Sequence, residues 1–163
     1  MSSEELEPVP HDIENLDCIL VRLVIDGEDA LFIMAFKDGR IQRLGSGTPG
    51  NADQQTLIGT TTDPVFERLC LKVNENWFGH GGTHQQPGVR GKNCELTLSF
   101  QFTDKTEVGL TYLYGSDSKG PPRDVVEFVA YSAHVTNPWW EEQKRKVGDT
   151  VAEVSRRPWW KLW

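Results

Sequence analysis

The sequence predicts a mainly β protein, built as an antiparallel β-sandwich or barrel-like sheet of about seven strands with one or two short C-terminal helices. Apolar runs and alternating apolar and polar residues recur along the chain, and clusters of turn residues separate them. No helical pattern lies between these segments before residue 137, which disfavours βαβ folds. The length of 163 residues fits one domain.

The first three predicted strands form a meander over residues 17–44. Asp26-Gly27-Glu28-Asp29 is predicted to be a turn, and Asp38-Gly39 between two strand-like runs predicts a hairpin with a type I′ turn. The strands are expected at Cys18–Asp26, Ala30–Lys37 and Arg40–Leu44.

The remaining strands are predicted from alternation and β-branched content. The clearest is Cys94–Thr103, in which Cys94, Leu96, Leu98, Phe100 and Phe102 share one side. Residues 124–135 are assigned as a strand, although their periodicity also permits a helix. The others are a short strand at Thr56–Ile58, then Val65–Val73 and Glu107–Tyr114.

The end of the chain has helix signals. Asn137-Pro138 is a suitable start for a helix over Trp139–Val147, which Gly148 would end. A capping-box pattern at Thr150 to Glu153 predicts a second short helix, ended by Pro158. The predicted organisation is an acidic flexible leader (1–16), an antiparallel β domain (17–136) and a Trp-rich helical tail (137–163) packed on the domain or on a partner.

The charge distribution excludes a broad nucleic-acid-binding face. The net charge is −7, and residues 1–30 hold nine acidic residues against Arg22, which gives −8 for this segment. We interpret the acidic leader as solvated, with contact to a basic partner as the alternative.

Cellular location is inferred from the cysteines and from hydropathy. The three cysteines, Cys18, Cys70 and Cys94, lie in apolar runs without any CxxC spacing, which favours buried, reduced thiols in a cytoplasmic protein. No segment has the ~20 apolar residues of a membrane-spanning helix. The N-terminal residues lack the features of a signal peptide.

The glycine-rich loop over residues 74–93 is the first candidate site. Its aromatic rings could stack on a small polar ligand, while its Arg, Asn and His side chains supply hydrogen bonds. The predicted ligand-binding residues are Trp77, Phe78, His80, His84, Arg90 and Asn93. The alternative is a structural loop whose aromatic rings complete the core.

A metal site through His80 and His84 is the second possibility for this loop. Two imidazoles could bind a divalent transition metal, with a third ligand from His134, Asp63 or Asp104. Glycines between the two histidines argue against a shared helix face, so the four-residue spacing is weak evidence.

The tail is the second candidate site. It carries five of the six tryptophans and a charge of +2, from six basic and four acidic residues. The predicted partner-binding residues are Trp139, Trp140, Trp159, Trp160 and Trp163. Packing on the sheet, joining copies of the chain into a homo-oligomer, and insertion at a membrane surface are the alternatives.

The leading functional hypothesis is a non-catalytic binding or interaction module without a cofactor, which recognises a protein partner or a small polar ligand. Two alternatives stay open. One is a small metal-dependent enzyme that uses His80 and His84. The other is an acidic protein inhibitor or neutralising partner.

Overall fold

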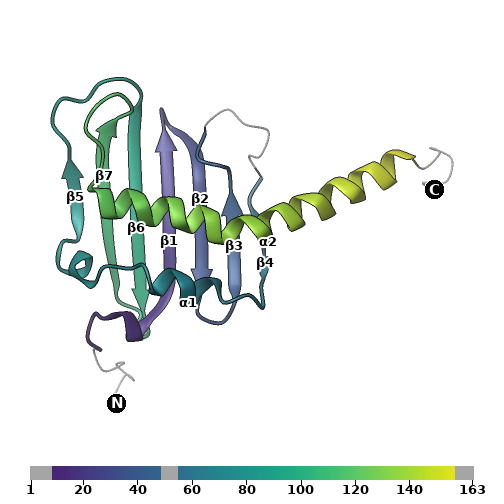
Figure 1. Ribbon diagram of the computed structural model, residues 1–163, viewed down its shortest axis with the longest axis horizontal. Coiled ribbons are helices and arrows are strands. Elements are labelled where there is room, and N and C mark those ends of the chain that lie inside the picture. The colour runs from purple at the N-terminus through teal and green to yellow at the C-terminus, as the bar shows by residue number, and fades with distance from the viewer. Residues whose placement is uncertain (1–8, 49–54, 157–163) are drawn as a thin grey trace, which may run out of the picture.

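The protein is a two-layer structure in which two helices lie over one face of a single β-sheet (Figure 1). The computed structural model describes residues 9–48 and 55–156, with side chains up to residue 147. The prediction of a mainly β fold is confirmed, with one sheet of seven strands, one long C-terminal helix and one short helix. The sheet is not closed and has no second sheet stacked on it in the described part of the chain, so neither a sandwich nor a barrel is confirmed.

The strand order is β4-β3-β2-β1-β6-β7-β5, and all neighbours are antiparallel except β5 and β7. The strands are β1 (Leu16–Ile25), β2 (Glu28–Phe36), β3 (Arg40–Leu44), β4 (Leu57–Thr60), β5 (Gly82–Gln85), β6 (Asn93–Phe102) and β7 (Glu107–Gly115). The helices are α1 (Val65–Cys70) and α2 (Arg123–Arg156), with 3-10 turns η1 (Ile13–Asn15) and η2 (Glu75–Gly79).

The predicted meander is confirmed as β1, β2 and β3. Between β1 and β2 both turn residues, Asp26 and Gly27, have positive φ, as a type I′ turn requires. Between β2 and β3 only Gly39 has positive φ, and its N–H donates to the carbonyl of Phe36. The second hairpin therefore forms without the predicted type I′ turn, because its loop is longer than two residues.

The strands predicted at Thr56–Ile58, Cys94–Thr103 and Glu107–Tyr114 are also confirmed, as β4, β6 and β7. The additional strand β5 lies inside the loop that was expected to be irregular. It pairs with the outer edge of β7 in parallel, a contact between segments far apart in sequence that local patterning does not reveal.

Two predicted strands are wrong, because both segments are helical. Residues 65, 69 and 73 are four apart, a spacing that fits a strand face and a helix face equally. Leu71 distinguishes a strand from a helix here. In a strand it would share the buried face of residues 69 and 73, but it is 82% exposed, and the segment begins with α1. Asp124–Val135 is likewise the first part of α2, in which Val125, Phe128 and Ser132 are buried at helical spacing.

The predicted start and end of the C-terminal helix are also wrong. Pro138 lies inside α2 rather than at its first turn, and the helix continues through Gly148 to Arg156. The burial of Val125, Phe128 and Trp139 on one side of a single helix explains why packing on the sheet overrides these local signals.

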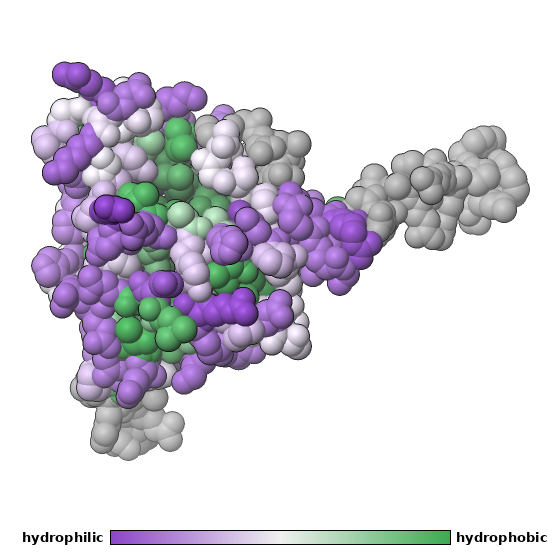
Figure 2. Space-filling model, in the orientation of Figure 1, coloured by the Kyte–Doolittle hydropathy of each residue, from purple (hydrophilic) through white to green (hydrophobic). Residues whose placement is uncertain are grey.

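The core lies between the sheet and the helices. Alternate residues of the central strands point towards α2, including Ile19, Val21, Ile33, Leu98 and Phe100. Figure 2 shows this side, where hydrophobic residues gather beside α2 over the strands and hydrophilic ones cover its outer surface.

The described end of the leader packs against the sheet. The His11 ring stacks on Phe102 with 4.2 Å between centroids, and Val9 donates its N–H to Asp104 at 3.1 Å. Ile13 packs against the core from η1. Residues 1–8 lie outside the described part of the chain.

Candidate functional site: the open face of the sheet

The face of the sheet opposite α2 is the most extensive candidate surface. We define the open face by the side chains of the central strands that alternate with the core positions. Its apolar members include Leu20, Val24, Phe32, Met34, Phe36, Leu44, Ile58 and Leu113. Its neutral polar members are Gln42, Thr97, Ser99 and Thr111.

The strand register places these side chains in rows across the sheet. One row runs from Ile58 on β4 to Ser99 on β6, through Gln42, Met34 and Leu20. Most of these side chains are half-buried by their neighbours, but Ile58 is 71% exposed. An uncharged, mostly apolar row that reaches an exposed isoleucine at the sheet edge is typical of an interaction surface.

Two shallow cavities lie on the open face. The larger, of about 500 Å³, is lined by Leu20, Arg22, Asp29, Phe32, Gln42, Leu44, Thr56, Thr97 and Ser99. The smaller, of about 270 Å³, is lined by Val24, Gly27, Gln85, Val89, Asn93, Cys94, Glu95, Leu113 and Tyr114. The paired residues Val24 and Glu95 line the smaller cavity, and the next pair on this face, Arg22 and Thr97, lines the larger one. The two cavities therefore adjoin along β1 and β6.

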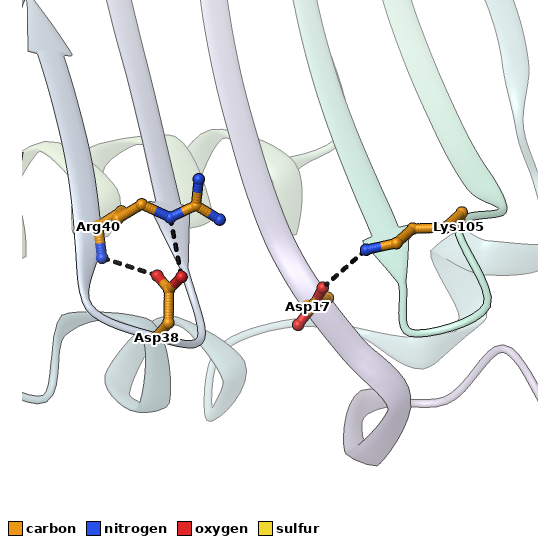
Figure 3. A network of polar contacts seen from close by, with 4 residues as sticks. All are labelled: Asp17, Asp38, Arg40 and Lys105. Atoms are coloured by element: carbon orange, nitrogen blue, oxygen red, sulfur yellow. Dashed lines mark hydrogen bonds and ion pairs between the residues drawn. The ribbon is translucent and has the colours of Figure 1, made fainter.

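Charged side chains border the apolar rows. At one end Asp38 accepts a 2.8 Å bond from Arg40, and Lys105 lies 3.7 Å from Asp17 (Figure 3). The Arg40 bonds hold the pKa of Asp38 below its usual range. Arg22 pairs with Asp29 at 2.9 Å. The exposed strand residues Glu95 and Glu107 add two carboxylates, so five acidic and three basic side chains leave the described face net negative.

Two of the predicted loop residues are core residues. Trp77 and Phe78 lie on η2, and each is less than 10% exposed. The Trp77 indole N–H donates to Asp124 at 2.9 Å, and the Phe78 ring contacts Phe100 edge-on at 5.2 Å between centroids. Neither ring is available for stacking on a ligand from solvent.

The other predicted loop residues do not converge. His80 bonds the carbonyl of Asn76 at 2.8 Å, and His84 bonds the carbonyl of His80 at 2.8 Å. Arg90 is exposed. Asn93 is the member that lies at the open face, where it lines the smaller cavity.

The described residues contain no group of three or more His, Cys, Asp or Glu side chains placed to hold a metal ion. The third ligands proposed for the histidine pair are scattered, because His134 lies on α2 and Asp63 precedes α1. Asp104 is engaged in the turn between β6 and β7, where it accepts bonds from Thr106.

The prediction of buried thiols is confirmed for Cys18 and Cys94, while Cys70 is half-buried. Burial raises the pKa of Cys18 to about 12 and that of Cys70 to about 11. These thiols are therefore protonated at neutral pH and are poor nucleophiles.

One cluster resembles a nucleophile and its base, at the β6–β7 turn. His11 Nε2 lies 2.9 Å from the hydroxyl of Thr106, which bonds a carboxylate oxygen of Asp104 at 2.6 Å. Because an ionised carboxylate only accepts, the hydroxyl donates to Asp104 and must accept from His11. The imidazole thus holds the turn and is not oriented to withdraw the hydroxyl proton.

The tail tryptophans divide into two groups. Trp139 and Trp140 are buried between α2 and the sheet, and Trp139 donates its indole N–H to the carbonyl of Thr60 at 3.1 Å. Trp159, Trp160 and Trp163 lie outside the described residues.

No family model, curated protein or solved structure matches the chain. None of the described helices is both long and apolar enough to span a membrane.

Asn93 is the one predicted ligand-binding residue that lies at the open face, and the sequence analysis did not predict the other residues of this face as a site. Its signal is the second parity of each strand: Leu20, Phe32 and Met34 alternate with core residues but are themselves apolar. Figure 1 shows that the described helices all lie on the other side of the sheet, so they leave these apolar side chains uncovered.

Proposed function

We propose that the protein is a non-catalytic interaction module whose open face binds an apolar, basic segment of a protein. The observation that carries this proposal is the uncharged row across five strands, in which the apolar side chains of Leu20, Met34 and Ile58 stand with the neutral Gln42 and Ser99 and which ends at the 71%-exposed side chain of Ile58. Exposed apolar surface of this kind is costly in a soluble monomer and marks binding sites.

The shape and charge of the face narrow the class of ligand. Its cavities are shallow, broad and open along the strands, which suits a polypeptide segment that crosses several strands better than an enclosed metabolite. The excess carboxylates Glu95 and Glu107 favour a segment that carries Lys or Arg beside its apolar anchors.

A random-peptide library selected on the immobilised protein tests the proposal. We expect enriched peptides to combine aromatic or aliphatic residues with Lys or Arg, and to lose binding to the Ile58→Glu variant. Leu71→Glu is the matched control, because Leu71 is 82% exposed on the helix-covered side. Peptides that bind both variants equally, or a library from which nothing is enriched, would refute the proposal.

A further inference from the structure

We infer that the segment bound by the open face is residues 157–163 of a second copy of this chain. This inference rests on the proposed function of the open face. The segment reads Arg-Pro-Trp-Trp-Lys-Leu-Trp and combines three tryptophans and a leucine with two basic residues. It therefore has both properties that the open face favours, large apolar anchors and positive charge.

The course of α2 carries the described end of the chain away from its own open face. Among the side chains of the helix that the structure describes, up to residue 147, Trp140 is the last buried one, and α2 then projects past β4, away from the sheet (Figure 1). The 16 residues from 141 to 156 span about 24 Å at 1.5 Å each, whereas the four residues from Arg157 to Trp160 reach at most about 14 Å when fully extended. These four residues are therefore too few to retrace the projecting part of the helix.

The projecting part of α2 has the character of a solvated arm. Its described side chains after Trp140 are mostly charged, and they pair within the helix: Glu141 with Lys144 at 3.1 Å, and Glu142 with Arg145 at 2.7 Å. Such pairs stabilise an exposed helix without any contact to the sheet. An arm of this kind carries the described end of the chain away from its own sheet, so that another copy can bind the segment that follows.

Charge complementarity also supports binding of residues 157–163 of one copy to the open face of another. The basic side chains of Arg157 and Lys161 flank the tryptophans, and Glu95 and Glu107 border the apolar rows of the open face. If each copy inserts its segment into the other, the two contacts are equivalent and the assembly closes as a two-fold dimer.

Sedimentation velocity on the full-length protein and on two full-length variants tests this inference. One variant carries Ile58→Glu on the open face, and the other carries Trp159→Ala with Trp160→Ala in the segment. We expect the wild type to dimerise and each variant to raise the dimer dissociation constant at least about tenfold, as expected for loss of a tryptophan anchor. Leu71→Glu and the double substitution Trp159→Phe with Trp160→Phe are controls expected to dimerise.

Mixing the two variants provides the decisive measurement. The segment of the Ile58→Glu chain is intact, and so is the open face of the Trp159→Ala, Trp160→Ala chain, so the mixture should regain a heterodimer through one contact. A strictly monomeric wild type overturns the inference. So does a dimer that fails only when the face is changed, which indicates face-to-face packing.

The same variants distinguish a tail that binds membranes from one that binds a second copy of the chain. Tryptophan-dependent cosedimentation with phosphatidylserine-containing vesicles, without dimerisation, would also overturn the inference. Library peptides that still require Ile58 in that case would leave the proposed function intact, so the two failures are separable.

Discussion

The guanidinium of Arg43 lies over the ring of Trp140, with 4.3 Å between its central carbon and the ring centroid. Arg43 is only 1% exposed, and its hydrogen-bond partners are neutral groups. Its Nε donates to the Gly45 carbonyl at 2.9 Å, and Nη1 donates to Thr136 at 2.6 Å and to the Ala133 carbonyl at 3.1 Å. Burial lowers the pKa of Arg43 to about 10, yet the side chain remains charged at neutral pH.

We therefore predict that Arg43→Ala lowers the free energy of unfolding by about 3 kcal/mol, because it leaves buried carbonyls unpaired and removes the cation from the Trp140 ring. Arg43→Lys should lose an intermediate amount, since an ammonium cannot reproduce the planar donor geometry. Urea unfolding measures both values. Arg40→Ala on the same strand is the control, and its exposed ion pair contributes at most about 1 kcal/mol. Equal losses in the two alanine variants would contradict this assignment.

A second prediction concerns the contact between η2 and the start of α2. The carboxylate of Asp124 accepts the indole N–H of the buried Trp77. Asp124→Ala should cost about 1–3 kcal/mol of unfolding free energy, because the buried donor loses its partner. Glu127→Ala, one turn later on the exposed side of α2, should change stability by less than about 0.5 kcal/mol. An unchanged stability of the Asp124 variant would show that the indole hydrogen bond makes no net contribution to the fold.

Alternating residues between clear turn signals correctly predicted the strands of the meander and of the β6–β7 hairpin. The prediction failed where the spacing of apolar residues fits a strand and a helix equally. Val65, Leu69 and Val73 fit either period, and only the exposure of Leu71 identifies a helix. The position of Arg43 is a different kind of failure. It lies two residues from Ile41 on β3 and shares its face, so it points into the core, where its partners are supplied by α2 from 90 or more residues away. The open face likewise depends on strand order, which no single segment encodes.

Pro138 provides a third prediction. It lies inside α2 and has no N–H to donate to the carbonyl of His134, four residues earlier. Figure 1 shows α2 changing direction as it passes the strands β3 and β4. Because Pro138 is exposed, Pro138→Ala should restore the helical bond without loss of packing and raise the unfolding free energy by about 1–3 kcal/mol. A loss of stability, measured by urea unfolding, would instead show that the bend is needed to seat Trp139 against Thr60.

The buried thiol of Cys18 gives a prediction for alkaline pH. Burial and the nearby Asp17 carboxylate raise its pKa from 9.0 to about 12, so the folded state keeps the proton that the unfolded chain loses. A raised pKa stabilises the fold below pH 9, and this contribution is lost as the pH rises towards 12. Between pH 7 and pH 10 the loss amounts to about 1.4 kcal/mol. The unfolding free energy of Cys18→Ala should therefore fall less steeply over this interval than that of the wild type. The comparison uses the slope against pH, so a difference in stability at pH 7 does not affect it. Asp17→Asn should flatten the fall by a smaller amount, since the carboxylate is the lesser cause of the shift. Parallel pH profiles for the wild type and Cys18→Ala would show that the thiol does not titrate in this way.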